Sequence, residues 1–262
     1  MIILKAPFSK GSLGKNPSSS EAPDAILKQA EDLYLNESGF SPRLKPQAIA
    51  VDQENIETTN KAILEAVKQQ TFQEKICLLG GDHSITYAGF RAFAQKHPEA
   101  GLIILDAHPD CEQETDPPSH EDFVRKLVND GIVEKDRLIL FGLRNWTGNE
   151  KEFLDSNKIR YFTMKQITKN DFNDVIDGLT ETISAWQNIY LSIDIDVADP
   201  SCAPGTGYME PGGLTARQLI NLVQRIRLLK NLKMIDLVEV GPDKDINNMT
   251  SKLAAKLLVE LS

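Results

Sequence analysis

The sequence predicts an α/β protein with one doubly wound, mostly parallel sheet of about eight strands and helices on both faces. Two observations support this fold class. Apolar segments of strand length alternate with helical segments along most of the chain, and several are apolar without interruption, as strands buried on both faces require. A chain of 262 residues can form a single α/β domain. Since no linker, internal repeat or low-complexity tail divides it, we expect one domain over residues 1–262.

The predicted strands are short runs rich in aliphatic residues. The clearest are GLIIL at 101–105 and IYLSI at 189–193, because each reads as a strand buried on both sides. The full set covers residues 2–6, 48–51, 75–79, 102–105, 138–140, 159–162, 189–193 and 234–240.

Helical patterns lie between these strands, and two other segments interrupt them. The last helix carries an apolar stripe at Leu253, Leu257 and Leu261. Segments 11–20 and 203–213 are rich in Gly, Pro and Ser, so we expect irregular, exposed loops there. The predicted helices cover residues 22–34, 56–70, 84–96, 121–130, 149–156, 169–185, 215–229 and 250–261.

Aspartates and histidines gather in three motifs at the ends of predicted strands: GGDHS at 80–84, DAHPD at 106–110 and SIDIDV at 192–197. Alternate residues of an extended chain share a face, so Asp106 and His108 point the same way, as do Asp194 and Asp196. Each motif alone is typical of a solvated turn or a helix cap. Together they place several carboxylates where α/β sheets bind ligands, and buried carboxylates must be neutralised, hydrated or bound to metal.

The residue types indicate which metal would bind. Carboxylates and imidazoles without cysteine favour Mn(II) or a neighbouring first-row ion over a thiolate-bound structural zinc. The three motifs offer more side chains than one ion needs, so we expect a pair of ions about 3.5 Å apart. His97 lies outside these motifs in the polar stretch QKHPE, and we expect it on the surface.

Composition narrows the class of partner. A net charge of −9 without a Lys/Arg stripe argues against nucleic acid and favours a cationic substrate. The cysteines Cys77, Cys111 and Cys202 have no framework spacing, which is typical of a reducing cytoplasm. Cys111 follows Asp110 directly, but no base is specified beside it, so we expect a bystander thiol. The segment MIILK is too short for a secretory signal and no run is long enough for a membrane helix, so we expect a cytoplasmic protein.

These motifs resemble those of the ureohydrolase family, which includes arginases, agmatinases and formimidoylglutamases. The resemblance covers nearly the whole chain. It implies a homo-trimer or homo-hexamer that hydrolyses a guanidino group to urea and an amine. It rests on APFSKG at 6–11, the three motifs above, APGTGYMEPGGLT at 203–215 and DLVEVGP at 236–242.

Carried over by position, the resemblance implies two Mn(II) ions per chain. One would be held by His83, Asp106, Asp110 and Asp194, and the other by His108, Asp106, Asp194 and Asp196, with Asp106 and Asp194 bridging.

The resemblance also implies three catalytic residues around a hydroxide that attacks the guanidinium carbon. Asp110 would accept a hydrogen bond from that hydroxide. His120 would be the proton shuttle for the leaving amine, and Glu239 would pair with the guanidinium.

The sequence departs from the family pattern at several positions. Glu121 and Asp122 follow His120 where the family commonly has glycine or alanine, and Gly241-Pro242 replaces Asn-Pro. Neither anchor that arginases use for the amino and carboxylate groups of their substrate is evident in CEQET at 111–115 or in RNWT at 144–147. The sequence motifs therefore resemble those of agmatinases more than those of arginases. Glu112 and Glu114 could attract the distal ammonium of agmatine.

Other readings stay open at this point. One is arginase or another guanidino-acid hydrolase. A second is a formimidoylglutamase, which would need a cation such as Arg144 or Arg125 to meet the substrate carboxylates. A third is a metal-dependent deacetylase of related fold, which the paired aspartates disfavour. The last is a family member that binds without turnover.

Overall fold

The computed structural model describes residues 1–262 and contains one eight-stranded sheet in the order β2-β1-β3-β8-β7-β4-β5-β6. Every pairing is parallel. The chain fills one edge first, crosses to β4 and the other edge, and returns to fill the middle with β7 and β8, which confirms the predicted fold class. The strands are β1 (Ile2–Ala6), β2 (Lys45–Ala48), β3 (Ile76–Gly80), β4 (Ala100–Leu105), β5 (Leu138–Leu143), β6 (Arg160–Thr163), β7 (Asn188–Asp194) and β8 (Leu232–Val238).

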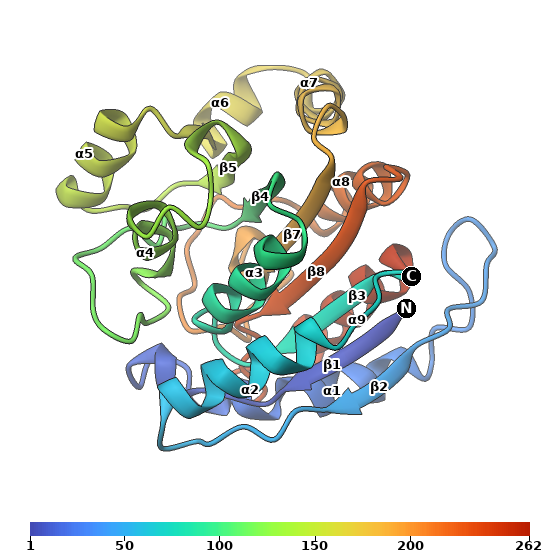
Figure 1. The fold of residues 1–262 in the computed structure, drawn as a ribbon. Coiled ribbons are helices and arrows are strands. Elements are labelled where there is room, and N and C mark those ends of the chain that lie inside the picture. The colour runs from blue at the N-terminus through green and yellow to red at the C-terminus, as the bar shows by residue number, and fades with distance from the viewer.

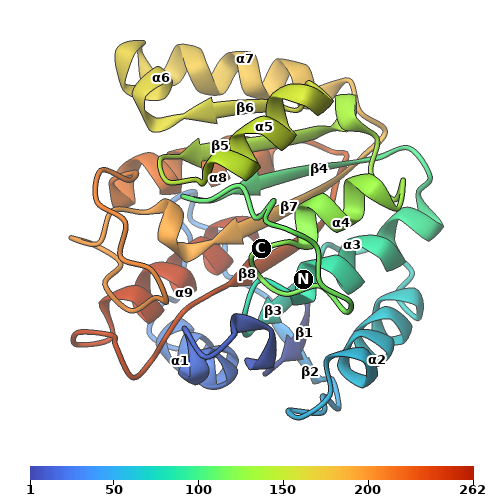
Figure 2. The same cartoon turned by 90° about the vertical axis from the view of Figure 1, so that its left-hand side faces the viewer.

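Helices cover both faces of the sheet (Figures 1 and 2). One face packs against α1, α6, α7, α8 and α9, and the other against α2, α3, α4 and α5, so each face has its own apolar core. None of these helices is long and apolar enough to cross a membrane. Their bounds are α1 (Ala22–Ala30), α2 (Ile56–Lys68), α3 (Ile85–Lys96), α4 (Phe123–Asn129), α5 (Gly148–Asn157), α6 (Met164–Lys169), α7 (Phe172–Ser184), α8 (Ala216–Arg227) and α9 (Met249–Leu261).

Several elements differ in their bounds from the sequence prediction, and three of them show why. The edge strand β2 begins three residues before the predicted 48–51. It is exposed along its length, so no apolar pattern in the sequence marks its position. The first helix ends at Ala30 rather than at residue 34. The predicted helix 169–185 is α7 alone, preceded by a separate helix α6. The break between them is stabilised by Asp171, whose side chain accepts a hydrogen bond from the amide of Asn173 and so begins α7.

The prediction that 11–20 is an irregular, exposed loop was wrong. This segment contains the 3₁₀ helices Lys10–Ser12 and Pro17–Glu21 and buries Asn16. It is tied to the loop after β3, because the amide of Ser12 donates to Asp82 Oδ2 at 3.0 Å. A Cβ on Gly11 would lie 2.0 Å from Ser84 Oγ, so this close approach requires glycine.

The segment 203–213 is also partly ordered by tertiary contacts. Thr206 forms an antiparallel bridge with Val240, and the amide of Gly205 donates to Thr250 Oγ1 at 2.7 Å. Both segments therefore lie at the edge of the sheet where the strands end.

His97 is half-buried, so its placement on the surface was also wrong. Its ring packs against Phe72 and Phe93, with centroids 5.1 and 4.7 Å away.

Candidate metal centre and active site

The four central strands β3, β8, β7 and β4 end at the same edge of the sheet because they are parallel. The chain turns sharply after β3, where a Cβ on Gly81 would lie 1.8 Å from the carbonyl oxygen of Phe8. This turn brings His83 over the sheet edge. Asp194 is the last residue of β7, and the other polar residues lie just after β4, β7 and β8: Asp106, His108 and Asp110; Asp196; and Glu239.

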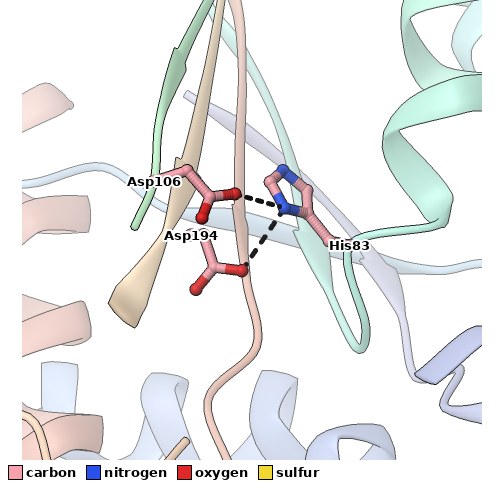
Figure 3. Close-up of side chains that lie close together, drawn as sticks. All are labelled: His83, Asp106 and Asp194. Carbon is pink, nitrogen blue, oxygen red and sulfur yellow. Dashed lines mark ion pairs between the residues drawn. The ribbon is translucent and has the colours of Figure 1, made fainter. Parts of the chain in front are cut away.

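The first cluster of side chains surrounds Nδ1 of His83. That nitrogen lies 3.1 Å from Asp106 Oδ2, 3.1 Å from Asp110 Oδ2 and 3.3 Å from Asp194 Oδ2. Figure 3 shows how His83 faces Asp106 and Asp194 from separate strand ends. All four side chains are buried.

The second cluster surrounds Nδ1 of His108. That nitrogen lies 3.1 Å from Asp196 Oδ2 and 3.5 Å from Asp106 Oδ1. Asp106 therefore presents one carboxylate oxygen to each histidine and joins the two clusters.

The donor atoms fit divalent ions. His83, Asp106 and Asp194 can offer ligand atoms within 4.8 Å of one another, and so can Asp106, His108 and Asp196. His83 Nδ1 and Asp106 Oδ2 are buried without a hydrogen-bond partner, and a bound cation would satisfy both. Oxygen and imidazole ligands without a thiolate suit a hard or borderline ion.

Side chains behind the cluster fix the orientation of His83. Its Nε2 lies 2.8 Å from Ser192 Oγ, and this hydroxyl donates to Asp236 Oδ1 at 2.6 Å. Asp236 Oδ2 accepts a further hydrogen bond from Thr86 Oγ1 at 2.8 Å. Because the serine proton is given to Asp236, its oxygen accepts from His83 Nε2–H, which leaves the Nδ1 lone pair facing the cluster.

Sequence reasoning missed this supporting chain, although signals for it were present. Ser192 lies two residues before Asp194 and therefore shares its face of the strand. Asp236 is a carboxylate within an otherwise apolar buried run, which is costly unless it is hydrogen-bonded.

The cluster carboxylates have shifted pKa values. Burial, and then the charges of neighbouring aspartates, raise the pKa of Asp194, of Asp196 and of Asp110, the last to about 7. Asp106 differs, because burial would raise its pKa but contacts with both histidines outweigh burial and hold the pKa below its usual value.

The cluster histidines have raised pKa values. Burial alone would lower the pKa of His83 and of His108, but contacts with carboxylates raise both well above the ordinary value. Without a cation the cluster therefore retains protons that a metal ion would displace.

Glu239 lies beside the first cluster in a left-handed backbone conformation, with φ of 64°. Its Oε1 accepts a hydrogen bond from the amide of His83 at 2.8 Å and lies 3.1 Å from Nδ1 of His120. Its Oε2 accepts from Asn16 Nδ2 at 2.8 Å. Asn16 was not predicted as a site residue, and nothing in the loop-like composition of 11–20 points to it.

His120 is buried at the wall of the site. Its amide donates to the carbonyl of Gly11 at 3.1 Å, and Asp122 fixes the preceding turn by accepting from the amide of Ser119 at 2.7 Å. Burial would lower the pKa of His120, but Glu239 outweighs burial and raises it to about 9. Nε2 of His120 has no hydrogen-bond partner.

These residues border a cavity of about 250 Å³. Its lining contains seven carboxylates and two histidines, but no lysine or arginine. The lining residues are His108, Asp110, Glu112, His120, Glu121, Asn145, Trp146, Thr147, Glu150, Asp194, Asp196, Thr206, Tyr208 and Glu239.

The two glutamates predicted to attract an ammonium group are separated. Glu112 lines the cavity, whereas Glu114 does not and instead contacts Lys126, at 3.8 Å, and Asn129. The prediction for Glu114 was wrong because the segment after Asp110 turns this side chain toward α4.

The arginines considered for substrate binding also lie outside the lining. The guanidinium of Arg144 donates to the carbonyl oxygens of Asp196 and Glu210, and that of Arg125 to those of Cys111 and Asn149. Cys111 is buried, and burial raises the pKa of its thiol well above the usual value, as a bystander requires.

The fold and the site define a class of protein: a parallel α/β protein with two linked acid–histidine clusters, fit for divalent metals, at the carboxyl edge of its sheet. A sequence model of the arginase family matches residues 1–262, and the chain belongs to this family.

Three relatives illustrate the family. An agmatinase of Bacillus cereus is 33% identical over 190 residues, a match that covers 70% of this chain and 61% of the agmatinase. An arginase of Staphylococcus aureus is 29% identical over 214 residues, covering 76% of this chain and 70% of the arginase. The solved structure of formimidoylglutamase from Bacillus subtilis superposes with a TM-score of 0.90 at 28% identity, covering 99% of this chain and 84% of that one. Because these relatives carry three different names, the substrate must be argued from the cavity.

Proposed function

We propose that the protein is a dinuclear manganese amidinohydrolase that cleaves the guanidino C–N bond of a small guanidino amine, with agmatine giving urea and putrescine as the first candidate. The observation that carries this proposal is the cavity lining, which has no lysine or arginine and keeps four carboxylates, Glu112, Glu121, Glu150 and Glu239, besides the proposed metal ligands. A substrate with a cation at each end fits this lining, whereas a substrate carboxylate would meet no cationic side chain.

Two divalent ions, when bound, lower the pKa of water and supply a nucleophile at neutral pH. The carboxylates and imidazoles suit Mn(II). The ligand sets would be His83, Asp106, Asp110 and Asp194 for one ion, and His108, Asp106, Asp194 and Asp196 for the other.

Three side chains would then serve the reaction. Asp110 lines the cavity, where its carboxylate would accept a hydrogen bond from the nucleophile. Glu239 stays ionised, because its contact with His120 outweighs burial and lowers its pKa. Three donors already reach its carboxylate, and about four acceptor positions exist, so one remains for the guanidinium.

His120 would protonate the leaving amine. Its Nδ1 faces Glu239, so Nε2 is the atom free to exchange a proton. Its raised pKa of about 9 keeps the imidazole protonated near neutral pH, as a general acid requires.

Guanidino acids and formimidoylglutamate are less suitable substrates for this cavity. Neither Arg144 nor Arg125 lines the cavity, and both guanidinium groups donate to backbone carbonyls elsewhere, so neither meets a substrate carboxylate there. Glu112, by contrast, is half-buried, lines the cavity and has no ion-pair partner, which leaves it available to an ammonium group.

The test is product release by the Mn-loaded protein with agmatine, arginine, guanidinobutyrate, free guanidine and formimidoylglutamate, the last followed as formamide. We expect urea from agmatine at the highest kcat/KM and no urea from the metal-free protein. Formamide release with no urea would replace the proposal by a formimidoylglutamase. No product from any of the five, with two ions verified per chain, would favour a member that binds without turnover.

Replacing Glu112 tests the ammonium contact. Glu112→Gln should raise the KM for agmatine about 2- to 5-fold, the range of a partly exposed ion pair, and leave kcat nearly unchanged. Glu114→Gln is the matched control, because Glu114 lies outside the cavity. Equal KM values for wild type and Glu112→Gln would remove Glu112 from the substrate site.

We also expect a homo-trimer or homo-hexamer, as the family resemblance implies, and a cytoplasmic location, as the cysteine usage favours. Light scattering on the purified protein measures this state directly.

A further inference from the structure

Tyr208 lies across the reactive end of the cavity. Its ring stacks on His120, with centroids 6.1 Å apart and planes 18° apart. The same ring meets His108 edge-on, with centroids 5.3 Å apart. Tyr208 therefore borders the cavity between the second cluster and His120.

Glu121 holds this ring in place. Tyr208 Oη donates to Glu121 Oε1 at 2.9 Å, and this oxygen also lies 3.8 Å from Nε2 of His120. Glu121 has no lysine or arginine partner. A hydrogen bond to a carboxylate is stronger than one between neutral groups. This bond therefore restrains Tyr208, in the segment 203–213, relative to Glu121, which lies just before α4.

The ring is one of only two apolar side chains in the lining, the other being Trp146. The carbon chain of a guanidino amine needs apolar surface within an otherwise charged cavity. Since Tyr208 contacts His108 and His120, the methylene next to the guanidino group would pack on Tyr208 rather than on more distant surface.

We propose that Tyr208, held by Glu121, is a specificity-determining wall that accepts an unbranched methylene at the guanidino end of the substrate and rejects a substituent there. This inference rests on the proposed function, because it concerns the same cavity and a guanidino amine. Glu121 is a positioning residue in this proposal, since it acts through the ring of Tyr208.

The test compares three compounds: agmatine, its analogue with a methyl group on the carbon next to the guanidino nitrogen, and its analogue with a methyl group on the carbon next to the amine. In Tyr208→Ala, the kcat/KM preference for agmatine over the first analogue should fall about 10-fold or more, the scale of discrimination that a pocket achieves against one methyl group. The preference over the second analogue should change far less, because that carbon lies at the other end of the chain.

Two further variants separate the wall from a general structural role. Glu121→Ala should relax the same preference by a smaller factor, and Glu121→Gln, which keeps an acceptor for the phenol, should restore much of it. Tyr161→Phe is the matched control, since it removes a phenol–carboxylate hydrogen bond, to Asp155, outside the cavity. An unchanged preference in folded, metal-loaded Tyr208→Ala would overturn the proposal.

If the wild type hydrolyses none of the three compounds, the proposed function fails, and the wall is tested by binding alone. Calorimetry on the Mn-loaded proteins should then show that Tyr208→Ala gains affinity selectively for the guanidino-side analogue. Equal affinities of wild type and Tyr208→Ala for this analogue, or no binding to either protein, would also contradict the proposed role of Tyr208.

Discussion

Ser192 decides which nitrogen of His83 faces the metal cluster. Because its hydroxyl donates to Asp236 and accepts from Nε2 of His83, it holds the imidazole ring with Nδ1 pointing at the carboxylates. Side chains that orient a ligand in this way commonly contribute 10- to 100-fold to metal affinity.

Ser192→Ala should therefore weaken Mn binding about 10- to 100-fold. Ser192→Thr keeps the hydroxyl and should recover most of the affinity. Metal titration of the purified proteins measures the effect, and Ser184→Ala, which alters an exposed hydroxyl in α7, is the control. An unchanged dissociation constant in Ser192→Ala would mean that packing alone orients the ring.

Asn16 acts on a different atom of the site, Oε2 of Glu239. Asn16→Ala should lower kcat about 10- to 100-fold, because Glu239 loses one donor and the loss of a charge-assisted hydrogen bond costs roughly 1.5–3 kcal/mol. Asn16→Asp should lower it further, since two carboxylates would then face each other at this position. Urea release at saturating substrate measures both, and wild-type kcat in Asn16→Asp would contradict the assignment.

At the scale of elements, the sequence predicted best the parts of the fold in which burial is uniform. β4 is apolar throughout and β7 is buried after its first residue, and both were identified with nearly correct ends. β2 was misplaced because this exposed edge strand is held by backbone hydrogen bonds. Such bonds do not require apolar side chains, so the sequence does not mark the strand. The structure brings together the aspartates and histidines of the three motifs because parallel strands end at one edge.

The missed site residues come from segments whose path is set by tertiary contacts. Asn16 reaches Glu239 only because 11–20 folds over the strand ends, and Tyr208 reaches His120 only through the bridge of Thr206 to Val240. Neither segment shows the periodic apolar pattern of a helix or strand, so the sequence predicted both 11–20 and 203–213 as exposed loops.

The turn after β3 tests how far the site depends on close backbone approach. Gly81→Ala would place a Cβ 1.8 Å from the Phe8 carbonyl, so backbone must move and the free energy of unfolding should fall by at least about 1–3 kcal/mol. Gly178→Ala is the matched control, and it should raise rather than lower the free energy of unfolding. Gly178 lies exposed within α7 with open space around it, and alanine should stabilise that helix by about 0.5–1 kcal/mol. Urea denaturation measures both, and equal stability of Gly81→Ala and wild type would show that the turn relaxes freely.

At the scale of the whole molecule, the metal-free protein concentrates buried titratable groups at one edge of its sheet. Asp110 has its pKa raised to about 7, so between pH 4 and 7 the folded protein keeps a proton that the unfolded chain has lost. The raised pKa values of His83 and His108 act in the same direction above pH 6.5. Stability from these groups therefore falls as pH rises, by up to about 1.4 kcal/mol per pH unit for each group.

Metal binding should remove this loss of stability at higher pH, because the ions displace the same protons and supply positive charge. We expect the difference in melting temperature between Mn-loaded and chelator-treated protein to grow from pH 6 to pH 8. Taking this difference at each pH cancels the titration of groups remote from the cluster. Asp110→Asn should flatten the pH dependence of the chelator-treated protein, because it removes one of the titrating groups. A metal-dependent shift of equal size at every pH would mean that the cluster binds metal without giving up protons, which would contradict the raised pKa values of Asp110 and His83.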